Sequence, residues 1–148
     1  MIHALQEIRR LLRPAGTLID IHPVAEASPV EIHQRGKTYL AGRLDVRQWC
    51  VDYEEANKAL TEIAERGLFA VERQGLFDSP TYYGSVREMH TSLKESLDKY
   101  ARDAQSAAVG LPEVEALIAP AQDLMDAAGF GAELTIRERI HIARLRPI

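Results

Sequence analysis

Two side chains that can carry a proton lie two residues apart in a short apolar stretch. Asp20 and His22 alternate with isoleucines just before Pro23. If the stretch is a strand, both side chains face one side near its C-terminal end, where open α/β sheets place their ligands. A histidine beside a carboxylate can act as a general acid or base, or as a ligand. The alternative is that the pair satisfies neighbouring backbone groups, and a spacing of two is too general to decide.

The other residue types that could bind a metal ion or a phosphate are not spaced as known metal or phosphate sites require. Histidines stand at positions 3, 22, 33, 90 and 141 without an HExxH pattern, and Cys50 is the only cysteine. The sequence therefore predicts no metal site, and it excludes a disulfide within the chain. Residues 129–131, Gly-Phe-Gly, are too short for a phosphate loop and end a helix instead of beginning one.

Aromatic residues gather in the middle of the chain. Four of them are candidates for lining a pocket for a small apolar molecule: Trp49, Phe77, Tyr82 and Tyr83. The alternative is that these side chains pack helices onto hairpins in the core. The composition does not distinguish the two roles.

Length and charge limit the classes of function. The 148 residues suit a single domain, 1–148, with an α/β fold of mixed α+β character. The net charge of −4 does not indicate the excess of basic residues that is typical of proteins that bind nucleic acid. The longest apolar run is far below the ~20 residues that span a bilayer, and the N-terminus lacks a signal-peptide pattern. We therefore expect a cytoplasmic protein that binds neither nucleic acid nor membranes.

Four helices are predicted from apolar periodicity and capping signals. They span residues 4–12, 52–67, 85–108 and 112–129. In the first, Leu5, Ile8, Leu11 and Leu12 share one face. Pro120 should kink or split the last helix, because a proline removes a helical hydrogen bond.

Strands are expected at residues 17–21, 30–34, 38–44, 68–74, 76–83 and 132–145. The first is apolar on both faces apart from Asp20, which is typical of an interior strand in a parallel sheet. Residues 35–37 and Gly75 should turn two hairpins. Glu138 falls on the apolar face of the last strand, so we expect a bulge, a sheet edge or a paired carboxylate there.

A longer motif includes the Asp20 and His22 pair. Residues 4–24 read Ala-Leu-Gln-Glu-Ile-Arg-Arg-Leu-Leu-Arg-Pro-Ala-Gly-Thr-Leu-Ile-Asp-Ile-His-Pro-Val, and Ala128-Gly-Phe-Gly precedes the terminal strand. These two regions, about a third of the chain, resemble the class I S-adenosylmethionine-dependent methyltransferases, in which the first motif leads from the fourth helix into the fifth strand. Ala15 departs from the pattern, which has glycine at that position.

The resemblance implies a truncated Rossmann-like methyltransferase sheet with inserted hairpins and flanking helices, whose terminal strand lies antiparallel beside residues 17–21. In that family S-adenosylmethionine is held by a glycine-rich turn and an acidic residue upstream of this motif, and this sequence has neither. The resemblance therefore implies a methyltransferase-like protein with no cofactor bound to the isolated chain. Such a protein would bind a small apolar ligand or a partner, such as a separate N-terminal half.

Without upstream strands, residues 17–21 would expose an unpaired edge. We expect this edge to be filled by the hairpin at 30–44 or by a second copy in a homodimer. An alternative function is an autonomous enzyme in which Asp20 and His22, with Glu138 or Tyr82, perform acid–base chemistry in a dimer-interface pocket. A longer natural protein that starts before Met1 is a third possibility.

Overall fold

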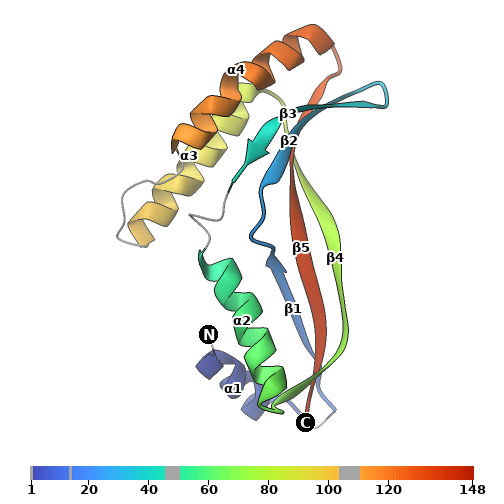
Figure 1. Ribbon diagram of the computed structural model, residues 1–148, viewed down its shortest axis with the longest axis vertical. Helices are drawn as coiled ribbons and strands as arrows, with labels where there is room; N and C mark the ends of the chain where they lie inside the picture. The colour runs from blue at the N-terminus through green and yellow to red at the C-terminus, as the bar shows by residue number, and fades with distance from the viewer. Residues whose placement is uncertain (1, 14, 46–50, 104–110) are drawn as a thin grey trace. The chain divides into compact units, whose positions relative to one another are not determined.

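The computed structural model describes residues 2–13, 15–45, 51–103 and 111–148 and has a mixed α+β fold (Figure 1). The helices are α1 (Ile2–Leu11), α2 (Val51–Glu65), α3 (Val86–Asp103) and α4 (Leu111–Ala128). The strands are β1 (Leu18–Pro23), β2 (Ser28–Gln34), β3 (Lys37–Leu44), β4 (Phe69–Tyr83) and β5 (Glu133–Pro147). They form an antiparallel sheet of order β1-β5-β2-β3, in which β4 also pairs with β5. Among the described helices, none has the length and apolar composition needed to cross a bilayer.

The chain divides into two compact units. Unit 1 comprises Met1–Ala25, Cys50–Asp78 and Arg139–Ile148, and unit 2 comprises Glu26–Trp49 and Ser79–Glu138. Unit 1 therefore holds α1, β1, α2, the N-terminal part of β4 and the C-terminal part of β5. Unit 2 holds β2, β3, α3, α4, the C-terminal part of β4 and the N-terminal part of β5.

The core of unit 1 joins two helices to the sheet. Its buried members are Leu5 of α1, Ala59, Leu60 and Ile63 of α2, Phe69 of β4, and Ala143 and Leu145 of β5. Ile8 and Leu12 pack against this core as predicted, but Leu11 is 71 % exposed. The end of α2 agrees with the sequence prediction, because Gly67 has a φ of 66°, which suits glycine after a helix.

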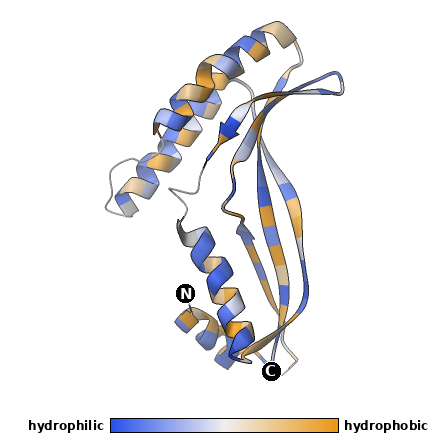
Figure 2. Ribbon diagram, in the orientation of Figure 1, coloured by the Kyte–Doolittle hydropathy of each residue, from blue (hydrophilic) through white to orange (hydrophobic). Residues whose placement is uncertain are grey.

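The core of unit 2 lies between the sheet and α4, which contacts β2, β3 and α3. Buried apolar residues alternate along the strands, with Val30 and Ile32 on β2 and Leu134 and Ile136 on β5. Figure 2 shows that hydrophobic and hydrophilic residues succeed one another along β5. The predicted cap of α3 is present, because the Glu88 backbone N–H donates to Ser85 Oγ at 3.1 Å. Pro120 does not split α4, which is one continuous helix.

The hairpin predicted around residues 35–37 is confirmed. Strands β2 and β3 pair antiparallel from Ser28↔Leu44 to Gln34↔Lys37, leaving a two-residue loop. Both loop residues have positive φ, 48° at Arg35 and 76° at Gly36, as a type I′ turn requires. Glycine adopts this conformation freely, whereas arginine is strained in it.

Replacing Arg35 with asparagine is expected to stabilise the protein by about 0.5–1 kcal/mol, because asparagine tolerates the left-handed conformation and favours this turn. Urea unfolding monitored by circular dichroism measures the change. Arg35→Ala is the matched control: it removes the same charge but keeps the backbone strain, so its stability should stay near that of the parent. Equal gains in both variants would contradict the turn assignment.

The position of β1 corrects one prediction. β1 pairs antiparallel with β5, from Leu18↔Leu145 to Pro23↔Ile140, and the described residues provide no parallel neighbour. The hairpin at 30–44 does not fill its edge, because β2 pairs with residues 133–136 of β5 instead. The apolar residues Ile19 and Ile21 suggested an interior strand, yet they are 50 % and 58 % exposed.

A second correction concerns β4, which is one strand of 15 residues and not a hairpin. Gly75 lies within it in extended backbone, since its φ is not positive. The strand β5 is also 15 residues long, and the pairing of these two strands overrides the local turn signal. Pro80 is tolerated because β4 has β5 as its sheet partner and otherwise lies at an edge.

Candidate functional site

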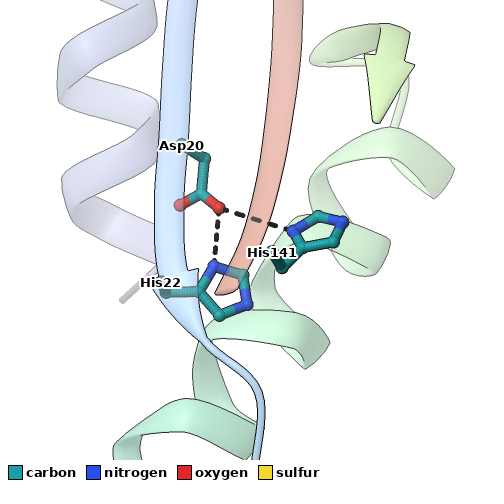
Figure 3. Close-up of side chains that lie close together, drawn as sticks. All are labelled: Asp20, His22 and His141. Atoms are coloured by element: carbon teal, nitrogen blue, oxygen red, sulfur yellow. Dashed lines mark hydrogen bonds and ion pairs between the residues drawn. The ribbon is translucent and has the colours of Figure 1, made fainter. Parts of the chain in front are cut away.

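The cluster richest in chemically active side chains in unit 1 joins β1 to β5. Asp20 and His22 come from β1 and His141 from β5 (Figure 3). His22 and His141 are directly opposite in the register, so their side chains share one face of the sheet. Asp20 lies two residues earlier and shares that face. One potential ligand atom from each residue lies within 4.8 Å of the other two.

One carboxylate oxygen of Asp20 faces both imidazole rings (Figure 3). This oxygen, Oδ2, is 2.6 Å from His22 Nδ1 and 3.9 Å from His141 Nδ1. The first distance is a short, charge-assisted hydrogen bond, and the second is too long for a hydrogen bond. The ring centroids of His22 and His141 are 5.1 Å apart.

The surroundings of the cluster restrain His22 more than His141. Asn57 of α2 places its Oδ1 3.0 Å from His22 Nε2, so both ring nitrogens of His22 have a partner. Two acceptors suit a doubly protonated ring, and turning the Asn57 amide over would suit a neutral one. By contrast, His141 Nδ1 is buried and makes no hydrogen bond within the described part of the chain. Buried polar atoms of this kind are rare in native proteins, so this nitrogen requires a physical explanation.

A pocket of about 300 Å³ in unit 1 reaches the cluster. Asn57 and His141 are among its lining residues. The remainder is largely apolar, with Leu60 of α2, Val71 of β4 and Leu145 of β5. A small molecule in this pocket would therefore contact two of the four residues that make up the site.

The described aromatic candidates do not share a pocket. Phe77 belongs to unit 1 and is 44 % exposed, whereas Tyr82 belongs to unit 2, is 61 % exposed and lines a separate pocket there. Tyr83 follows Tyr82 on β4 and faces the opposite side. Burial raises the pKa of Tyr83, opposed by a hydrogen bond with Ser92. Trp49 lies outside the described residues.

Glu138, the acidic residue predicted on an apolar face, belongs to unit 2. It lies between the segments of β5 that pair with β2 and with β1. Burial raises its pKa above the usual value of a glutamate, and its charge in turn raises the pKa of Tyr83. The folded protein therefore favours the protonated form of Glu138 more than the unfolded chain does.

Glu138→Gln is expected to stabilise the protein at pH 7 and to leave it unchanged at low pH. The pKa of Glu138 is higher in the folded protein than in the unfolded chain. The stability that protonated Glu138 contributes is therefore complete below its pKa in the unfolded chain, and it is lost as the pH rises through its pKa in the folded protein. Glutamine stays neutral and avoids this loss. The free energy of unfolding of both proteins, measured from pH 3 to 8, tests this. A difference that does not grow between the acidic and neutral ends would contradict it.

Sequence reasoning missed His141 as a partner of Asp20 and His22. The sequence predicted a terminal strand at residues 132–145, which includes His141, and the family resemblance paired that strand with residues 17–21. The register was the missing quantity, because a shift by one residue would move His141 to the other face. Only the pairing His22↔His141 brings the two rings together.

No family model, no curated protein and no solved structure matches the chain.

Proposed function

We propose that unit 1 binds a divalent transition-metal ion, such as Zn²⁺, through Asp20, His22 and His141. The observation that carries this proposal is the convergence of one ligand atom from each of the three residues, all within 4.8 Å of one another. In the same cluster the buried His141 Nδ1 makes no hydrogen bond within the described residues. Two imidazoles and a carboxylate form a ligand set that suits zinc and other late first-row metal ions. Coordination would satisfy the buried nitrogen, whose desolvation otherwise costs free energy.

The distances require only small adjustments. Around an ion with bonds of about 2.0–2.1 Å, tetrahedral ligand atoms lie about 3.4 Å apart. The Asp20–His22 distance of 2.6 Å is shorter than this, and the Asp20–His141 distance of 3.9 Å is longer. Each must change by less than about 1 Å, which side-chain torsions can supply without moving the paired strands.

Three protein ligands would leave one coordination position for water or a substrate. Catalytic zinc sites have this arrangement, whereas structural sites have four protein ligands. Asn57, which contacts His22, would orient that ring from outside the metal shell. The ion would supply Lewis-acid chemistry or an activated water, and the neighbouring pocket would admit the substrate.

Metal titration of the whole chain tests the proposal. We expect saturable binding of one Zn²⁺ per chain by isothermal titration calorimetry, together with a higher melting temperature. Excess free zinc at 100 times Kd would stabilise the fold by about 2.7 kcal/mol. Mg²⁺ is the control ion, because it prefers an octahedral oxygen shell and should bind far more weakly. Absence of saturable Zn²⁺ binding would refute the proposal.

The hydrogen bond of 2.6 Å between Asp20 and His22 favours a second candidate function, acid–base catalysis without a metal. A carboxylate that holds an imidazole in one orientation is how enzymes prepare a histidine to move a proton. Glu138 and Tyr82, the other acid–base candidates, belong to unit 2. A strongly deshielded Nδ1 proton of His22 in NMR spectra that persists in excess Zn²⁺ would favour this candidate over metal binding.

We further propose that the chain is related to class I methyltransferases and represents the substrate-side part of that sheet. The antiparallel pairing of β1 with β5 supports this, because the resemblance implies that pairing. In this proposal the chain binds a small molecule or a separate N-terminal half in the cytoplasm and carries no S-adenosylmethionine by itself. Calorimetry that finds micromolar binding of S-adenosylmethionine to the chain would contradict it.

A homodimer formed across β1 is a related proposal. β1 lies at one end of the strand order, and Ile19 and Ile21 are exposed on it. A second β1 could pair antiparallel across a two-fold axis and cover this edge. Analytical ultracentrifugation should then show a dimer, and Ile21→Lys should shift it to monomer. A monomer at all concentrations would exclude this assembly.

A further inference from the structure

Unit 2 carries a polar pocket of about 480 Å³ that the metal proposal does not use. Its floor is formed by Glu31 and His33 of β2 and by Thr135 and Arg137 of β5. These residues alternate with Ile32, Leu134 and Ile136, which are buried in the core of unit 2. The pocket therefore lies on the sheet face opposite to the one that packs against α4.

The floor of the pocket is a connected hydrogen-bond network. Arg137 donates from Nη2 to Glu31 Oε1 at 2.8 Å and from Nε to Glu31 Oε2 at 3.2 Å. His33 links two hydroxyls, with Nε2 3.0 Å from Thr135 Oγ1 and Nδ1 3.0 Å from Thr38 Oγ1. The Glu31 side chain is only 10 % exposed. These contacts hold donors and acceptors in fixed directions before a ligand arrives.

The charge of the lining is nearly balanced. Glu31 and Arg137 neutralise each other, and Glu133 adds one negative charge. A phosphate or carboxylate would gain little from a cation that is already paired in bidentate fashion, and it would meet the two glutamates. The pocket thus offers many directed hydrogen bonds and little net attraction for an anion.

One wall of the pocket is aromatic. Tyr82 of β4 lines it and is 61 % exposed, and Pro80 lies on the same strand face. The face of an aromatic ring carries partial negative charge and attracts polarised C–H bonds. A ligand that combines an array of hydroxyls with a C–H face would use both the wall and the floor.

We propose that this pocket binds a neutral carbohydrate of one or two sugar rings, with vicinal hydroxyls on the Glu31–Arg137 pair and the Thr38 hydroxyl and a C–H face against Tyr82. This site is independent of the metal proposal because it shares no residue with Asp20, His22 or His141. Its occupancy should therefore be the same in EDTA and in Zn²⁺.

Saturation-transfer NMR and calorimetry on the full chain test this proposal with glucose, galactose, mannose, N-acetylglucosamine and their common disaccharides. At least one should bind saturably, with transfer strongest to the C–H protons of one ring face. Tyr82→Ala should weaken that binding about tenfold, the equivalent of 1.4 kcal/mol. Tyr39→Ala is the matched control, since Tyr39 pairs with Ile32 and lies on the other face, and it should change nothing.

Three results would overturn the proposal. They are no saturable binding of any neutral sugar, equal binding by the parent and by Tyr82→Ala, or stronger binding of glucose 6-phosphate than of glucose. Since Tyr82 is exposed, its substitution should leave the fold intact, which circular dichroism verifies. His33→Ala, which breaks the link between Thr38 and Thr135, provides a second variant and should also weaken binding.

Discussion

Replacing His141 with alanine is expected to weaken Zn²⁺ binding more than about 100-fold. Loss of a residue that merely orients a ligand already costs about 10–100-fold in metal affinity, and His141 would be a direct ligand. The substitution also breaks no hydrogen bond of the buried His141 Nδ1, because this atom makes none within the described residues. Competition of protein against a chromophoric chelator measures the affinity.

His90→Ala and His33→Ala are the matched controls for this experiment. Both remove a histidine from unit 2, where His90 pairs with Glu115 and His33 with Thr38 and Thr135. Surface histidines bind zinc weakly, so both variants should keep the affinity of the parent. If they lose as much affinity as His141→Ala, zinc binds elsewhere and the assignment to unit 1 is wrong.

Phe69→Ala should lower the free energy of unfolding by about 3–5 kcal/mol, the typical cost of emptying a buried aromatic position. Phe69 is 1 % exposed and belongs to the cluster that joins α2 to β5 in unit 1. Its loss removes apolar contacts and leaves a cavity between the helix and the sheet. Because a domain of this size is stabilised by only about 5–15 kcal/mol, the variant should be close to unfolding at 37 °C. Urea unfolding with intrinsic fluorescence measures the change.

Phe77→Ala is the control on the same strand. Phe77 is 44 % exposed, so truncation removes partly hydrated surface and should cost under about 1 kcal/mol. The comparison separates burial from any effect of losing an aromatic residue from β4. Similar losses in the two variants would show that the core of unit 1 is arranged differently.

Local signals in the sequence predicted most of the elements. Apolar periodicity located α2 and α3, the Ser85 cap located the start of α3, and the turn at Arg35 and Gly36 located the hairpin. Long-range pairing was the part that local signals could not supply. The 15-residue β4 continues through Gly75 because β5 is a pairing partner of equal length. Strand pairing therefore outweighs the tendency of Gly75 to form a turn, and a local sequence pattern does not reveal which of the two prevails.

The candidate site was predicted in part for the same reason. Asp20 and His22 share a face in any strand, so their proximity followed from the sequence. Their third partner depended on the register between two strands at opposite ends of the chain. The role of Asn57 could not be predicted from the sequence either, because Asn57 contacts His22 only when α2 packs against β1.

The most direct test of the central proposal is NMR of the imidazole nitrogens during addition of one equivalent of Zn²⁺. Metal coordination changes the chemical shift of the nitrogen that binds it, so the ring signals of His22 and His141 should change together and saturate at one equivalent. Those of His3, His33 and His90 should stay in place. If zinc leaves the rings of His22 and His141 unchanged, or perturbs all five histidines alike, the metal site does not exist.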